Sequence, residues 1–333
     1  MVRIHATPIA LGRFLQRKQA TPERASPGNV DQRATQNDRR FIQRPASMCA
    51  SPSVVLFALL AFVLPLVHGS RAAENSVEVA GTGPDVLLLP DLASSGAALK
   101  PIADDLRRCF RTHIFTLAGF AGQPANPSPQ VPAWERSLSD YIGKLDAAQA
   151  IVIGHGLGGI LGLRLAIDHP QRVRQLVVLD ALPFPAAVGA PGATRPHAQE
   201  IQAPILTQSA EDFRTMQQQT LSSLTTHPES VPMLVEWAIH SDRHAMADAL
   251  DEMLTTDLRK RVADVRTPTL VLVPWEPSQP QDAATTLDLY RKQYAGLTQA
   301  QVKIIKGSRH FLTFDQPIVT NWAIEEFLGG CAH

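Results

Sequence analysis

Short apolar runs alternate with amphipathic stretches along the chain from residue 76 onward. Runs that are apolar at every position predict strands buried on both faces, whereas apolar residues spaced three or four apart predict helices. The pattern predicts strands at Ser76–Ala80, Asp85–Pro90, Arg111–Leu117, Ala150–Gly154, Val173–Asp180, Thr267–Val273 and Gln301–Ile305. Strands that alternate with helices favour a mostly parallel sheet with helices on both faces, which is the α/β class.

The alternation is interrupted over Pro183–Asp264. This segment has Pro- and Gly-rich loops followed by polar-rich helical stretches, and it has no strand pattern. We therefore expect residues 74–182 and 265–330 to form the α/β core. Residues 183–264 are expected to form a helical cap inserted into that core.

The N-terminal part of the chain differs from the rest. Residues 1–47 are basic, rich in Gln and Pro and without an apolar period, which predicts disorder or an over-extended gene model. An apolar run over Val54–Val67 and the small residues after it are typical of a signal peptide, so residues 48–72 are expected to be removed near Ala72. The folded part would then be exported, either periplasmic or secreted. An uncleaved N-terminal membrane anchor and a buried core helix are the alternatives.

Charge, cysteine spacing and glycine spacing give no indication of a nucleic-acid partner, a metal site or a nucleotide cofactor. Lys plus Arg and Asp plus Glu both total 31, so the neutral chain offers no argument for nucleic acid, and membrane contact is expected only through the N-terminal signal or anchor. Cys109 and Cys331 are candidates for a disulfide, and their spacing matches no metal site. The glycines of Gly154–Gly159 imitate a dinucleotide motif without its other parts. We expect no metal and no cofactor, and the sequence predicts no oligomeric state.

The stretch Gly154–Gly158 lies between a predicted strand and a predicted helix. This is the layout of a nucleophile elbow, G-x-S-x-G, in which glycines allow a sharp turn that presents a serine hydroxyl. The serine position is Gly156 in this chain. Glycine has no hydroxyl, so a serine acyl-enzyme cannot form, although we expect the turn to keep its shape.

From Val77 to Phe327 the chain resembles the α/β-hydrolases with a cap after the sixth strand, whose members mostly hydrolyse esters, amides and related bonds. The resemblance implies a nucleophile, an acid and a histidine in that order, with two backbone N–H groups as an oxyanion hole. It places His310, in the Gly-Ser-Arg-His-Phe segment after the last strand, at the catalytic histidine. It assigns the oxyanion hole to Leu92 and Leu157.

The acid of the triad has more than one candidate. The segment Trp275–Pro280 resembles the D-P-x-x-P of the family, which makes Glu276 the expected acid, while Asp180 is the alternative and Asp282 the third choice. Asp91 stands where the family often has glycine. Its carboxylate either enters the oxyanion pocket, where it would oppose a negative intermediate, or is a solvated turn residue.

Three interpretations of the missing serine follow. The first, which needs the fewest assumptions, is a natural or engineered pseudoenzyme of esterase ancestry, inactive or strongly impaired in serine-dependent hydrolysis. The second is a serine-independent enzyme based on His310 and Glu276. The third is a non-catalytic protein that binds a small apolar or ester-like ligand between core and cap.

Overall fold

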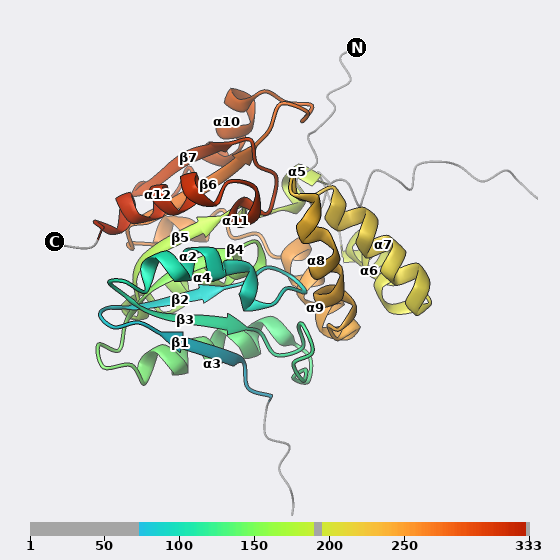
Figure 1. Ribbon diagram of the computed structural model, residues 1–333, viewed down its shortest axis with the longest axis horizontal. Coiled ribbons are helices and arrows are strands. Elements are labelled where there is room, and N and C mark those ends of the chain that lie inside the picture. The colour runs from blue at the N-terminus through green and yellow to red at the C-terminus, as the bar shows by residue number, and fades with distance from the viewer. Residues whose placement is uncertain (1–72, 190–194, 331–333) are drawn as a thin grey trace, which may run out of the picture. The chain divides into compact units, whose positions relative to one another are not determined.

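The computed structural model describes residues 73–189 and 195–330, and these form a doubly covered α/β sheet (Figure 1). The strand order is β1-β3-β2-β4-β5-β6-β7. Only β1 is antiparallel to its neighbour, β3, and the other pairs are parallel. The strands are β1 (Ser76–Ala80), β2 (Asp85–Leu89), β3 (Arg111–Thr116), β4 (Ala150–His155), β5 (Val173–Leu179), β6 (Thr269–Trp275) and β7 (Ala300–Lys306). The predicted α/β class is confirmed.

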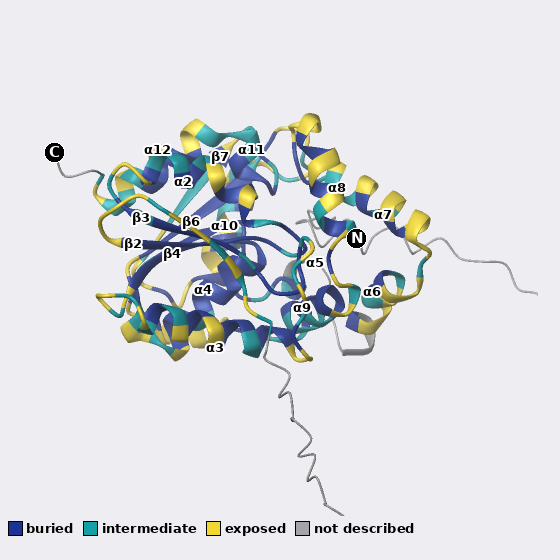
Figure 2. Cartoon of the chain, turned by 60° about the horizontal axis from the view of Figure 1, so that its bottom comes forward, coloured by how far each residue is buried: buried dark blue, intermediate teal, exposed yellow. Residues whose placement is uncertain are grey.

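Alternate residues of the central strands pack on opposite faces of the sheet. In β2, Leu87 and Leu89 join the cluster on one face, and Val86 and Leu88 join the cluster on the other. The first face is covered by α3 (Gln130–Gly143), α4 (Leu157–Asp168) and α10 (Ala283–Gln293), and the second by α2 (Lys100–Leu106) and α12 (Pro317–Leu328). Burial on both faces explains why these strands are apolar at consecutive positions (Figure 2).

The cap is a set of helices inserted between β5 and β6. Its helices are α5 (Ala186–Gly189), α6 (Arg195–Thr207), α7 (Ala210–Ser222), η3 (Pro228–Ser230), α8 (Val231–Ile239) and α9 (Arg243–Thr255). Within it α6 packs on α9 and α7 packs on α8, and α9 also contacts α3 and α4 of the core. The insertion follows the fifth strand of the described sheet, so the count of six is corrected.

Short helices complete the core, and some of the sequence-based expectations fall outside the described residues. The short helices are η1 (Gly96–Leu99), η2 (Pro170–Arg172), η4 (Arg261–Asp264) and α11 (Leu312–Asp315). The expected signal peptide lies outside the described residues, as does Cys331, so pairing of Cys331 with Cys109 stays a prediction. In the described ranges, no helix is long and apolar enough to span a membrane, and no group of acidic, histidine or cysteine side chains is arranged to hold a metal.

Candidate active site

The turn between β4 and α4 has the geometry of a nucleophile elbow. Gly156 connects the two elements with φ 52° and ψ −114°. Glycine adopts this positive φ without the steric cost that a side chain would add. The flanking glycines are also required by close contacts, because a Cβ on Gly154 would lie 2.2 Å from the Gly158 carbonyl oxygen. The expectation that the elbow keeps its shape without serine is confirmed.

The carboxylate of Asp91 fills the space beside Gly156. A Cβ built on Gly156 would lie 1.9 Å from Asp91 Oδ1 and 2.5 Å from Asp91 Cγ. Asp91 Oδ1 accepts a hydrogen bond from the Leu157 backbone N–H at 2.8 Å. Asp91 is 8% exposed, so the interpretation as a solvated turn residue is wrong. The carboxylate therefore takes both the place of a nucleophile side chain and the N–H expected to form half of an oxyanion hole.

Strand register explains why Asp91 and Gly156 meet. β2 and β4 are parallel neighbours, and Leu89 pairs with Gly154. Asp91 and Gly156 each follow their paired residue by two positions, so both leave the same edge of the sheet side by side. This is the edge at which parallel α/β proteins bind ligands.

His310 lies between two carboxylates. Its Nε2 is 2.8 Å from Asp91 Oδ2, and its Nδ1 is 2.6 Å from Asp180 Oδ2. The second oxygen of Asp180 accepts the Tyr290 hydroxyl. Asp180 follows β5 with a positive φ of 43°, a conformation that Asp tolerates better than most residues and that turns its side chain out of the strand direction. The chain thus forms a continuous Asp91–His310–Asp180 arrangement at the elbow.

The contacts of His310 fix its charge. Burial alone would lower the pKa of His310, but the charge of Asp91 and the hydrogen bonds to both carboxylates raise this pKa to about 10. Burial likewise opposes ionisation of Asp91, whereas the charge of His310 and its hydrogen bond lower the pKa of Asp91 to about 2. The resting pair at neutral pH is therefore an imidazolium and a carboxylate. His310 already holds the proton that a general base would have to accept.

His155 supports His310 from the elbow. The two rings lie with centroids 4.3 Å apart, and His155 Nε2 donates to the His310 carbonyl oxygen at 2.8 Å. Burial and the positive charge of His310 lower the pKa of His155 to about 4, so His155 is neutral at neutral pH. The bond to the backbone fixes the position of His310 without adding a second positive charge.

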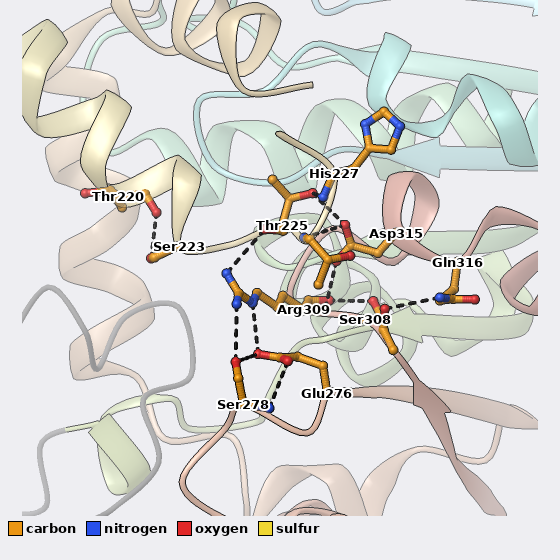
Figure 3. A network of polar contacts seen from close by, with 12 residues as sticks. Thr220, Ser223, Thr225, His227, Glu276, Ser278, Ser308, Arg309, Asp315 and Gln316 are labelled. Atoms are coloured by element: carbon orange, nitrogen blue, oxygen red, sulfur yellow. Dashed lines mark hydrogen bonds and ion pairs between the residues drawn. The ribbon is translucent and has the colours of Figure 1, made fainter. Parts of the chain in front are cut away.

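Glu276 does not contact His310, and the preference for Glu276 as the acid is corrected in favour of Asp180. Glu276 accepts hydrogen bonds from Ser278 and, at 3.0 Å, from Arg309 Nε (Figure 3). Burial opposes ionisation of Glu276, but the hydrogen bonds from Ser278 and Arg309 lower its pKa. Glu276 is therefore the partner of a neighbouring arginine rather than of the histidine.

Two conservative substitutions distinguish these roles. Asp180→Asn removes a negative charge and an acceptor from His310 Nδ1, so we expect the pKa of His310 to fall by about one unit or more. Glu276→Gln is the matched control and should leave this pKa unchanged. Titration of ¹³C-labelled histidine by NMR measures both variants. An equal shift in Glu276→Gln would contradict the assignment of Asp180.

A cavity of about 130 Å³ lies between the core and the cap, directly against the elbow turn and His310. Asp91, Gly156, Asp180 and His310 form part of its wall, and Leu92, one of the two residues expected to supply the oxyanion hole, borders it as well. Most of the remaining lining is aliphatic and comes from both core and cap, namely Ala93, Ile160, Ala181, Leu182, Pro185, Ile201, Ile205, Leu221, Leu224, Leu234, Ala238, Met246, Leu250 and Met253. Such a cavity fits a small, mainly apolar molecule.

The loop that carries His310 is fastened to the cap by a cap–core junction, formed by Leu224, Thr225, Thr226, Arg309 and Asp315. One oxygen of Asp315 accepts the Thr225 hydroxyl and the Thr226 N–H, at 2.5 and 2.8 Å, and the other accepts the Arg309 N–H at 2.7 Å (Figure 3). On the other side of His310, the N–H of the next residue donates to the Leu224 carbonyl at 3.1 Å. Both neighbours of the histidine are therefore tied to the cap segment.

Of the two positions that the sequence left open for Asp91, the structure has the oxyanion pocket. The sequence did not show that the carboxylate of Asp91 also fills the space beside Gly156. The available signal was that each of these two residues comes shortly after the end of a buried strand. Asp282, the third choice for the acid, instead caps α10 by accepting the Thr285 N–H.

A mostly parallel sheet, an elbow turn, a histidine after the last strand and an acid after an earlier strand define an α/β hydrolase. The chain belongs to the alpha/beta hydrolase family, since the model of that family matches residues 66–321.

Individual relatives are hydrolases of several kinds. The chain is 24% identical to "Putative carbamate hydrolase RutD" of Azorhizobium caulinodans, over 80% of this chain and 98% of that protein. It is 28% identical to a pimeloyl-[acyl-carrier protein] methyl ester esterase of Xylella fastidiosa, over 58% of this chain and 76% of the esterase. An enol-lactonase from Burkholderia xenovorans has a similar fold, with a TM-score of 0.65 and 18% identity, over 77% of this chain and 96% of that one.

Proposed function

We propose that this α/β hydrolase does not hydrolyse esters through a serine and instead binds a small, mainly apolar ligand in the cavity between core and cap. The single observation that carries the proposal is the position of the Asp91 carboxylate. It lies where a Cβ of residue 156 would be, and it accepts the hydrogen bond of the Leu157 N–H. Loss of the serine is thus accompanied by loss of the space and of a donor that serine chemistry needs.

Electrostatics support this proposal. Acyl transfer builds negative charge on the carbonyl oxygen, and donors aimed at that oxygen contribute about 2.7–4 kcal/mol each in serine hydrolases. Here a buried carboxylate lies beside Leu157, so a developing oxyanion would be repelled instead of stabilised. His310 is already protonated and cannot accept a proton from a nucleophile.

The relatives are named for hydrolysis of several related bonds. Their names describe a carbamate hydrolase, a methyl ester esterase and an enol-lactonase. We take the ligand of this chain to be a compact, mostly apolar molecule of the kind that such pockets enclose. The aliphatic lining from both core and cap is consistent with that choice.

Serine-independent catalysis is the second candidate. A carboxylate and an imidazolium lie 2.8 Å apart at the wall of the cavity, so Asp91 could act as a general base on a bound molecule and His310 could supply the proton once its bond to Asp91 is broken. In this form of the proposal, Asp180 takes the role that had been given to Glu276.

Ester hydrolysis and ligand binding test the two candidates. We expect the wild-type protein to be inactive on short-chain p-nitrophenyl esters and to be stabilised thermally by benzyl alcohol, since a ligand that binds only the folded state raises Tm. Thr220→Trp, on the half-buried cavity residue of α7, should abolish the shift and is the control for the location. Wild-type esterase activity that disappears in His310→Ala would favour the second candidate and contradict the first.

A further inference from the structure

The polar part of the cavity wall has an excess of negative charge. Asp91 and Asp180 both contact the single imidazolium of His310. Asp180 accepts a hydrogen bond at each oxygen, from His310 and from Tyr290. The neighbouring histidine, His155, carries no charge at neutral pH, because burial and the positive charge of His310 lower its pKa to about 4.

The charged centre, formed by Asp91, Asp180 and His310, has acceptors that a ligand can use, whereas its own side-chain donors already make hydrogen bonds within the protein. Each oxygen of Asp91 accepts one hydrogen bond, from Leu157 or from His310, and a carboxylate oxygen can accept two. Asp91 borders the cavity, so its remaining acceptor capacity is available there. The side-chain donors of this centre are all used, since both N–H groups of His310 point at carboxylates and the Tyr290 hydroxyl points at Asp180.

The remaining polar residues of the wall do not change this balance. Ser94, Gln217 and Thr220 are neutral, and each side chain can both donate and accept. They can serve an anionic, a neutral or a cationic ligand. Discrimination by charge therefore depends on Asp91 and its partners.

We infer that the cavity selects a small apolar molecule that carries a hydrogen-bond donor and no negative charge, either an amine or an alcohol, and that it excludes carboxylates. An ammonium or hydroxyl group would donate to Asp91, and hydrogen bonds to a charged group are the stronger kind. A carboxylate would have to be buried among aliphatic side chains next to a second carboxylate, with no free donor from the charged centre. The site would thus refuse the acid that an ester hydrolase releases. This inference rests on the proposed binding function.

Three probes with the same cyclohexane ring test the selection. Cyclohexylamine, cyclohexanol and cyclohexanecarboxylate differ at neutral pH in the charge and donor capacity of a single substituent. We expect the amine and the alcohol to bind the wild-type protein at least tenfold more tightly than the carboxylate, measured by calorimetry and by thermal shift. Thr220→Trp should remove binding of all probes, which locates it in the cavity.

The variant Asp91→Asn gives the matched control, because it keeps the shape and removes the negative charge. We expect the difference between amine and carboxylate to shrink at least tenfold. Equal binding of carboxylate and alcohol by the wild-type protein would overturn the selection while leaving the binding function intact. Unchanged selectivity in a folded Asp91→Asn would also overturn it. Failure of all three probes to bind would overturn the proposed function and this inference with it. The wild-type comparison decides even where the variant does not fold.

Discussion

Ester hydrolysis is expected to appear when Asp91→Gly and Gly156→Ser are combined, and to be absent from each single variant. Gly156→Ser alone places a Cβ 1.9 Å from Asp91 Oδ1, so the hydroxyl cannot reach its position. Asp91→Gly alone frees the Leu157 N–H but supplies no nucleophile. Together the two changes leave room for the hydroxyl, free the donor and remove the charge that keeps His310 protonated, so that His310 can act as the base.

The assay compares the wild-type protein with the three variants on short-chain p-nitrophenyl esters. Removal of the nucleophile from a serine hydrolase costs on the order of a million-fold in turnover. Partial recovery in an unoptimised site should give the double variant at least about 100-fold higher kcat than either single variant. The triple variant that also carries His310→Ala is the control and should lose this gain. Equal activity in Gly156→Ser alone would show that Asp91 does not block the site.

The second large effect is a loss of stability at alkaline pH. The pKa of His310 is about 10 in the folded protein, compared with an ordinary value of 6.5. Its contribution to stability is fully present below pH 6.5 and is lost as the pH rises toward 10, because the folded state then holds a proton that the unfolded state has released. We expect the free energy of unfolding to fall by about 1.4 kcal/mol per pH unit within this window.

Urea unfolding between pH 7 and pH 9.5 measures this slope, and His310→Gln is the control. The variant has no titrating group at this position, so its free energy of unfolding should depend less on pH, whatever its absolute stability. The lowered pKa of Asp91 acts at the opposite end, where stability is lost as the pH falls from 3.8 through about 2. A wild-type free energy of unfolding that is flat from pH 7 to 9.5 would contradict the imidazolium assignment.

The sequence was sufficient for the fold because its strongest signals are local. Runs such as Val86–Leu89 are apolar at every position since both faces of the sheet are covered, and the parallel α/β class follows from that pattern. The elbow was also predictable, because the glycines at 154 and 158 permit backbone contacts that no other residue allows.

The candidate site was only partly predictable because it depends on strand order. His310 could be recognised from its place after the last strand, and Glu276 from its flanking prolines. Which acid meets the histidine is decided in space, where Arg309 and Ser278 bind Glu276, while Asp180 directly follows the strand next to the elbow. The meeting of Asp91 with Gly156 likewise requires β2 and β4 to be neighbours, although β3 separates them in the chain.

The cap–core junction connects the edge of the cavity to the loop that carries His310. Leu224 borders the cavity and also accepts the N–H of the residue after His310, while Asp315 joins Thr225 to the residue before it. Exit past this edge would break those bonds and shift the histidine away from both of its carboxylates. Opening of this edge would therefore separate the loop of His310 from the cap beside a buried ion pair.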